Sequence, residues 1–300
     1  MLPIEEAILR TILYADVFNF PLTLDEIHHF LIYAKTVTRH EIEQQLGRSQ
    51  TLNEVVTCCS SYYALKGRED LASERATLEC TADTLMASAM RHGMWLARLP
   101  FVRMVAVTGA LAVRNPKDGR DDLDYFLIVE PGRVWLTRGL AILLVRFGRL
   151  RGVEICPNYV LASDRLAQRR RDLFIAREIT QMIPIFGHEW YTAFRDANTW
   201  ATTFQANADR PLYEQRVLHV TGFWFQMKRA AEWLLGGPIG NALETWEFRR
   251  KRAKFRAKME TYAETAAEIE AGVVKGHFDD YGNPALIAYR DRLQGFGLSV

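Results

Sequence analysis

Apolar residues in the first part of the chain recur at helical spacing and predict three short helices. The first helix is indicated by a stripe of five residues: Ile4, Ala7, Ile8, Ile12 and Leu13. Pro21 ends this pattern, because the residue before a proline avoids the α region. Two further helices are each predicted by a capping box at the N-terminus: Thr23 with Glu26, and Thr38 with Glu41. We expect the second helix to run to Tyr33 and the third to Gly47.

A β-hairpin is predicted directly after these helices. Residues 55–65 are rich in Val, Thr, Cys, Ser and Tyr, a composition typical of strands. Three helices followed by a hairpin is the element order of a winged-helix domain. The segment 1–70 carries six basic and ten acidic residues, a net charge of −4. Because groove-binding helices need Lys and Arg for the phosphates, a packing or protein-contact role is favoured over binding of duplex DNA.

The middle of the chain mixes helical and strand patterns, and the remainder reads as helical. Helix formers and an amphipathic pattern predict helices at 72–98 and 134–149. Alternating, β-branched sequence predicts three strands, at 102–107, 123–130 and 153–161. From residue 164 onward the pattern is almost wholly helical.

These elements predict a predominantly helical α+β protein. Its parts would be a winged-helix-like headpiece over 1–70, a small mixed-sheet core with a long leading helix over 71–165, and an all-α part over 166–300. The 300 residues are 49% hydrophobic and 25% charged, which excludes a disordered chain, a collagen and a small disulfide scaffold. The formal net charge of +2 is too weak to indicate a nucleic-acid partner by itself.

Cysteine usage and hydropathy point to the cytoplasm. The four cysteines include no C-x-x-C pair, so neither a zinc site nor a disulfide framework is indicated. The first ten residues, MLPIEEAILR, carry two acids and no basic region ahead of their apolar residues, unlike a signal peptide. The longest apolar runs, such as residues 140–145, are far shorter than the ~18 residues of a membrane span. We therefore expect a cytoplasmic protein with no membrane partner.

The chemistry is concentrated in residues 105–130, VAVTGALAVRNPKDGRDDLDYFLIVE. Asp122 and Asp124 stand two apart on a predicted strand, so both side chains point to one face, roughly 6–7 Å apart between Cα atoms. Two such carboxylates repel each other unless a cation lies between them, and hard oxygen ligands at this spacing suit Mg²⁺. Upstream, Gly109 allows close backbone approach to an anion, and Arg114, Lys117 and Arg120 add positive charge. This combination is typical of a site for a nucleoside triphosphate.

The same segment resembles the signature of the DNA polymerase beta-type nucleotidyltransferase superfamily. That signature is a hydrophobic strand, Gly-Gly or Gly-Ser, a gap of around ten residues, and two aspartates separated by an apolar residue. Gly109, Ala110, Asp122 and Asp124 fall on those positions. The strand–helix–strand continuation to residue 161 is similar to the family's minimal core. The whole chain also resembles bacterial stand-alone nucleotidyltransferase-domain proteins, with a helical part on each side of the core.

Two positions depart from the family pattern. Ala110 stands where the family usually has Ser or Gly, so a hydroxyl that would bond a phosphate is absent. The resemblance places a third carboxylate on the strand after the crossover helix. Glu154, Cys156 and Asn158 share one face of that strand. Glu154 is the candidate, and Asn158 is a neutral alternative that cannot act as a base.

The resemblance implies transfer of a nucleoside monophosphate from a triphosphate to a hydroxyl-type acceptor, with release of pyrophosphate. Asp122, Asp124 and Glu154 would be the catalytic and metal-binding residues, with Mg²⁺ or Mn²⁺ as the metal. Gly109, Ala110, Arg114 and Lys117 would contact the nucleotide. The alternative is a catalytically degenerate core that serves as an interaction or regulatory protein.

The acceptor is left open by the sequence: a small molecule, a protein or RNA. The segment 249–258, RRKRAKFRAK, holds seven basic residues in ten. It could contact the phosphates of a polynucleotide, or it could be a solvated helix face balanced by nearby glutamates. The second interpretation is favoured.

Overall fold

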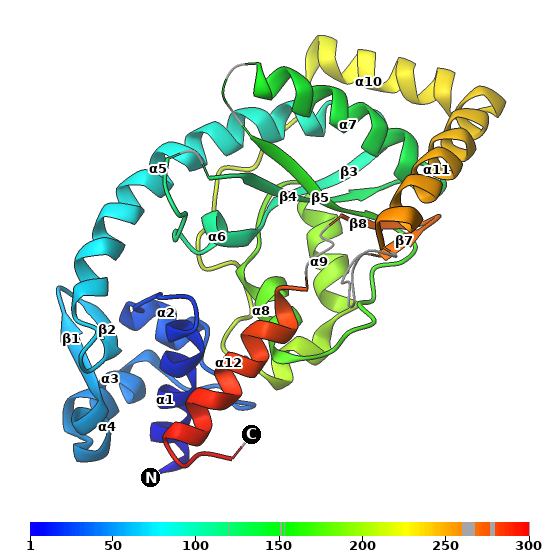
Figure 1. Ribbon diagram of the computed structural model, residues 1–300. Helices are drawn as coiled ribbons and strands as arrows, with labels where there is room; N and C mark the ends of the chain where they lie inside the picture. The colour runs from blue at the N-terminus through cyan, green and yellow to red at the C-terminus, as the bar shows by residue number, and fades with distance from the viewer. Residues whose placement is uncertain (120, 151, 153, 260–267, 277–279, 300) are drawn as a thin grey trace.

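The computed structural model describes residues 1–119, 121–150, 152, 154–259, 268–276 and 280–299. Helix makes up 54% and strand 15% of it, which confirms a mixed, predominantly helical protein. Figure 1 shows two bodies joined by the long helix α5 (Asp70–Ala97): a small helical headpiece that holds the N-terminus, and a larger sheet-containing body.

The headpiece contains the predicted helices and hairpin. Its elements are α1 (Pro3–Asp16), α2 (Leu24–His29), α3 (Arg39–Arg48), α4 (Gln50–Val55), β1 (Val56–Cys59) and β2 (Tyr62–Leu65). Both capping boxes form: the backbone N–H of Thr23 donates to Glu26 at 2.8 Å, and that of Thr38 donates to Glu41 at 2.8 Å. Helix α2 ends at His29, four residues earlier than predicted, and α4 was not predicted.

The larger body is built on a six-stranded sheet. Its strands are β3 (Val102–Val107), β4 (Leu123–Val129), β5 (Ile155–Ala162), β6 (Ile183–Phe186), β7 (Glu268–Glu270) and β8 (Val273–Lys275). The strand order is β6-β3-β4-β5-β8-β7. Only the β4–β5 pair is parallel among the described pairings, and the crossover between these two strands is α7 (Val134–Arg149).

The expectation of an all-α part over 166–300 is wrong. This segment supplies β6, β7 and β8 to the sheet, beside its helices α8 (Leu173–Gln181), α9 (His188–Asp196), α10 (Gly222–Leu235), α11 (Pro238–Met259) and α12 (Gly282–Gly295) and the 3₁₀ turn η1 (Thr199–Thr203). The three strands are only three or four residues long, too short to show a clear period of two. Pro184 further weakens the strand signal of β6, although a proline is tolerated there because β6 lies at the sheet edge.

Helices cover both faces of the sheet. Helices α5 and α7 pack on one face, where Tyr125 and Leu127 of β4 are buried, and α8 and α9 pack on the other, where Phe126 and Ile128 are buried. In Figure 1 helix α12 returns to lie along α1 of the headpiece. The C-terminal segment therefore shares buried cores with both earlier segments. The boundaries at residues 70 and 165 stay predictions.

None of the described helices is long and apolar enough to cross a membrane.

Candidate functional site

The two aspartates lie at one edge of the sheet, where β3 ends and β4 and β5 begin. Asp122 directly precedes β4 and is exposed, whereas Asp124 is its second residue and is partly buried. Between them Leu123 turns to the opposite face and packs in the α5–α7 core. Strand alternation thus places the two carboxylates together, as predicted.

Gly109 lies close to the Asp124 side chain, in a backbone conformation that other residues adopt only with strain. Its φ is +68°, and a Cβ built on it would lie 2.5 Å from Oδ2 of Asp124. The neighbouring Thr108 N–H donates to the backbone oxygen of Asp124 at 3.0 Å, which extends the β3–β4 ladder to the turn. The turn continues into the short helix α6 (Gly109–Ala112), of which Ala110 is the second residue. Sequence analysis predicted the close approach, but not that the group approached is Asp124.

A bulge in β5 brings a second strand to the same carboxylate. Asp124 pairs with Cys156, but Phe126 pairs with Tyr159, so β5 has one extra residue in this stretch. The Asn158 amide Nδ2 donates to Oδ1 of Asp124 at 2.8 Å. The Cys156 side chain also hydrogen-bonds Asp124. Asp124 is therefore enclosed by β3, β4 and β5 together.

The close packing of these side chains raises the pKa values of the acidic groups at the site. Burial, together with the charges of Asp122 and Glu178, raises the pKa of Asp124 to about 7. Burial also raises the pKa of Asp122, together with its hydrogen bond to Glu154 and that group's charge. Burial and the neighbouring aspartates raise the pKa of Cys156 to about 12, so this thiol is neutral. The site disfavours negative charge when no cation is present.

Glu154 and Asn158 each reach a different aspartate. Glu154 lies just before β5 with its side chain 55% exposed, hydrogen-bonds Asp122 and lies 3.8 Å from the Arg149 guanidinium. Asn158 bonds Asp124 instead. The structure thus brings both candidates for the third position to the site.

Of the three cationic residues predicted in the loop before the aspartates, Arg120 lies outside the described residues, and Arg114 and Lys117 are arranged differently from each other. Arg114 donates to Asp83 of α5 at 2.6 Å, and its guanidinium lies 5.5 Å from the centre of the Tyr213 ring. Lys117 is exposed, and its backbone N–H donates to Asp121 at 2.8 Å. Arg114 would have to leave Asp83 to meet a phosphate, whereas the Lys117 side chain is already in solvent.

Two charged residues near the site were not predicted. The charge of Glu178 in α8 raises the pKa of Asp124. Burial raises the pKa of Glu178 itself, and the charge of Lys275 in β8 lowers it. Lys275 pairs in register with Tyr159, one residue beyond Asn158. Both belong to the segment expected to be all-α. The packing of α8 brings Glu178 near the site, and the pairing of β8 with β5 brings Lys275 there, and neither contact has a local sequence signal.

The aspartate pair fits a magnesium ion that takes most of its ligands from water and phosphate. Within the described part of the chain, no three His, Cys, Asp or Glu side chains are grouped to hold a metal. Mg²⁺ commonly uses only one or two carboxylates and takes its other ligands from water and phosphate. Asp122 and Asp124 provide that donor set, and their mutual repulsion would be relieved by a cation.

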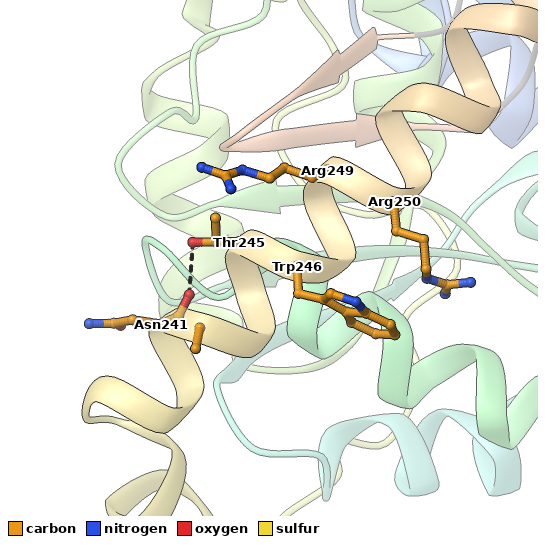
Figure 2. Close-up of a pocket in the computed structure, with 6 residues that line it drawn as sticks. Asn241, Thr245, Trp246, Arg249 and Arg250 are labelled. Atoms are coloured by element: carbon orange, nitrogen blue, oxygen red, sulfur yellow. Dashed lines mark hydrogen bonds between the residues drawn. The ribbon is translucent and has the colours of Figure 1, made fainter.

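A hollow elsewhere on the surface has no part in this chemistry. It has a volume of about 660 Å³ and lies along α11, lined by Asn241, Ala242, Thr245, Trp246, Arg249 and Arg250 (Figure 2). It contains no carboxylate and shares no residue with the aspartate site. The grouping of Asp122, Asp124 and Gly109 therefore decides the location of the candidate site, in preference to the size of this hollow.

Comparison with protein-family models, with curated proteins and with solved structures finds no match. The resemblance to the polymerase beta-type superfamily therefore rests on residues 105–130 and on the strand–helix–strand segment that follows them.

Proposed function

We propose that this protein is a Mg²⁺-dependent nucleotidyltransferase. It would move a nucleoside monophosphate from a nucleoside triphosphate to a hydroxyl-type acceptor and release pyrophosphate. The observation that carries this proposal is the contact of the Gly109 backbone with the Asp124 carboxylate, beside Asp122. It supports the assignment because a left-handed glycine turn and a two-carboxylate strand meet at one point, as the resemblance requires.

Each residue of the site has a role in this proposal. Asp122 and Asp124 would hold Mg²⁺, or Mn²⁺ in its place. The bound metal would supply charge stabilisation at the phosphoryl group. Asn158 keeps Oδ1 of Asp124 oriented through its amide, and Gly109 keeps the β3 turn against Oδ2.

The remaining residues of the site would act in the transfer step itself. The acceptor oxygen would bond to the α-phosphorus as the bond from that phosphorus to the pyrophosphate oxygen breaks. Glu154 is exposed and hydrogen-bonded to Asp122, so it is placed to take the acceptor proton. Lys117 is an exposed cation in the loop before the aspartates, and its side chain would approach the departing pyrophosphate from solvent.

A transfer assay tests this proposal. The protein is incubated with Mg²⁺, cell extract and each of the four nucleoside triphosphates labelled at the α-phosphate. Label is expected in an acceptor with one or more of them, with equivalent release of pyrophosphate. Asp122→Asn and Asp124→Asn should abolish transfer, whereas Asp25→Asn, an exposed position in the headpiece, should retain it. Absence of transfer with every triphosphate would contradict the proposal.

One observation favours the second candidate, a degenerate core that binds without catalysis. Asn158, the neutral candidate for the third position that cannot act as a base, hydrogen-bonds Asp124. A binding protein of this kind would take up a triphosphate with Mg²⁺ but release no pyrophosphate. Measuring binding and pyrophosphate release on the same samples separates the two candidates.

A further inference from the structure

Helix α10 has two charged side chains, Lys228 and Glu232, turned inward. Lys228 is buried, and its ammonium donates to the backbone oxygens of Ala97 at 2.8 Å and Val102 at 2.7 Å. Glu232 accepts from the backbone N–H of Phe101 at 2.8 Å and from Arg103 at 2.9 Å. These bonds fix one face of the helix to the end of α5 and the start of β3.

The outer face of α10 is apolar and exposed. Phe223, Met227, Ala230 and Leu234 recur at intervals of four, three and four residues, the spacing of a helix-packing seam. Phe223 is 68%, Met227 49% and Leu234 58% exposed. This is the reverse of the usual surface helix, which turns its apolar stripe to the core. The inner polar bonds prevent the helix from rotating to hide the stripe.

Helix α11 carries a second exposed stripe of the same kind. Ile239, Leu243 and Trp246 follow at intervals of four and three residues and are 60%, 39% and 58% exposed. Gly236 and Gly237 separate the two helices, which together form the outer edge of the molecule in Figure 1. Figure 2 shows the Trp246 ring lying on the surface of α11, beside the hollow described above.

We infer that α10 and α11 form the interface through which two copies of this chain pair. Apolar residues spaced three and four apart on a helix form a stripe that packs against another helix, and each copy has two such stripes. Trp233 is 84% exposed and flanks the α10 stripe. At roughly 200 Å² for each fully exposed large side chain, the two stripes and Trp233 offer about 800 Å², which is what one partner buries in a standard interface.

The charges agree with self-association. Helix α10 contains three charged residues, and two of them, Lys228 and Glu232, point inward. The remaining one, Arg229, lies off the stripe, so an anionic membrane or a nucleic acid would find little charge on α10 to attract it. The basic run of α11 begins at Arg249 and adjoins the end of the second stripe, where the Arg250 guanidinium lies 5.0 Å from the centre of the Trp246 ring.

Sedimentation of the full-length protein tests this inference. Across micromolar concentrations the wild type should sediment at twice the 34.5 kDa mass of one chain. The double variant Met227→Glu with Leu234→Glu places two charges in the seam. It should raise the dissociation constant of the dimer by roughly 100-fold or more, since each buried unpaired charge costs at least tenfold. Ile239→Glu, on the other stripe, should weaken the dimer independently.

The matched control is Arg229→Glu, which changes the charge of α10 by two units off the seam and should leave the dimer intact. All substituted side chains are exposed, so the variants should keep the wild-type melting profile of the monomer. A wild type that stays monomeric at every concentration would overturn the inference, as would a double variant that still dimerises. Flotation of monomeric wild type with anionic vesicles would overturn it in favour of a membrane surface.

Discussion

Asp124 is the residue around which the candidate site is organised. Its Oδ2 faces the Cα of Gly109, its Oδ1 accepts from Asn158, and Cys156 bonds it from the paired strand. A buried carboxylate beside the charge of Asp122 is a poor contributor to stability unless something positive joins it.

The metal-free protein should therefore lose stability as the pH rises through the range in which Asp124 ionises. Its pKa is raised to about 7, so from the ordinary pKa of 3.8 up to 7 the folded state binds the proton that the unfolded state has released. This stabilisation is complete below pH 3.8 and is lost as pH approaches 7. Asp124→Asn has no such group, so its melting temperature relative to wild type should increase from pH 5 to pH 8. A difference that shrinks with pH would mean that Asp124 stabilises the fold as an ion.

At the scale of elements, the meeting of β3, β4 and β5 makes the site. The Gly109 turn follows β3, the aspartates begin β4, and the bulge in β5 directs Asn158 to them. Each of these three features depends on a close backbone approach that a single side chain or one register shift would disturb.

Gly109→Ala should accordingly damage both fold and function. Alanine is strained at φ +68°, and its Cβ would meet the Asp124 carboxylate at 2.5 Å. We expect a loss of about 2 kcal/mol or more in the free energy of unfolding, measured by urea denaturation. Gly119→Ala is the control, because nothing lies within 4 Å of a Cβ there. Equal stability of the two variants would show that the turn is not as tight as described.

Sequence patterns predicted the elements that depend on neighbouring residues. The capping residues Thr23 and Thr38, and the alternation that puts Asp122 and Asp124 on one face, act within a few residues of chain. The β5 bulge, the pairing of β8 and the approach of Glu178 depend on segments far apart in sequence. The local hydrophobic periodicity of the sequence does not reveal contacts between distant segments. For this reason the C-terminal segment was expected to be all-α.

At the scale of the whole molecule, a buried ionic network joins the headpiece to the candidate site. The Arg75 side chain of α5 is fully buried and donates to Glu26 of the headpiece at 2.8 Å. It also donates to the backbone oxygen of Val113, just after α6, at 3.1 Å. Tyr213 donates to the same Glu26 at 2.6 Å. The headpiece thus helps to hold the chain that follows the Gly109 turn.

Removing the cation of this network should be costly. Arg75→Met leaves Glu26 buried without its ionic partner and should reduce the free energy of unfolding by about 3–5 kcal/mol. Hydrogen exchange of residues 109–119 should also accelerate, since Val113 loses its bond to α5. Arg39→Met removes an exposed pair with Asp25 and should change neither quantity appreciably. Unchanged hydrogen-exchange rates of residues 109–119 in Arg75→Met would show that the network does not stabilise this part of the candidate site.

The central claim is that Asp122 and Asp124 form a metal and triphosphate site. The most direct measurement is thermal melting of wild type and Asp124→Asn, each with and without Mg²⁺ and each nucleoside triphosphate. Mg²⁺ with a triphosphate should raise the melting temperature of wild type, because a ligand that binds only the folded state stabilises it. The same addition should leave Asp124→Asn unchanged, although that variant is at least as stable as wild type without metal. A wild type that shows no shift with any triphosphate at millimolar Mg²⁺ would contradict the claim, as would an equal shift in both proteins.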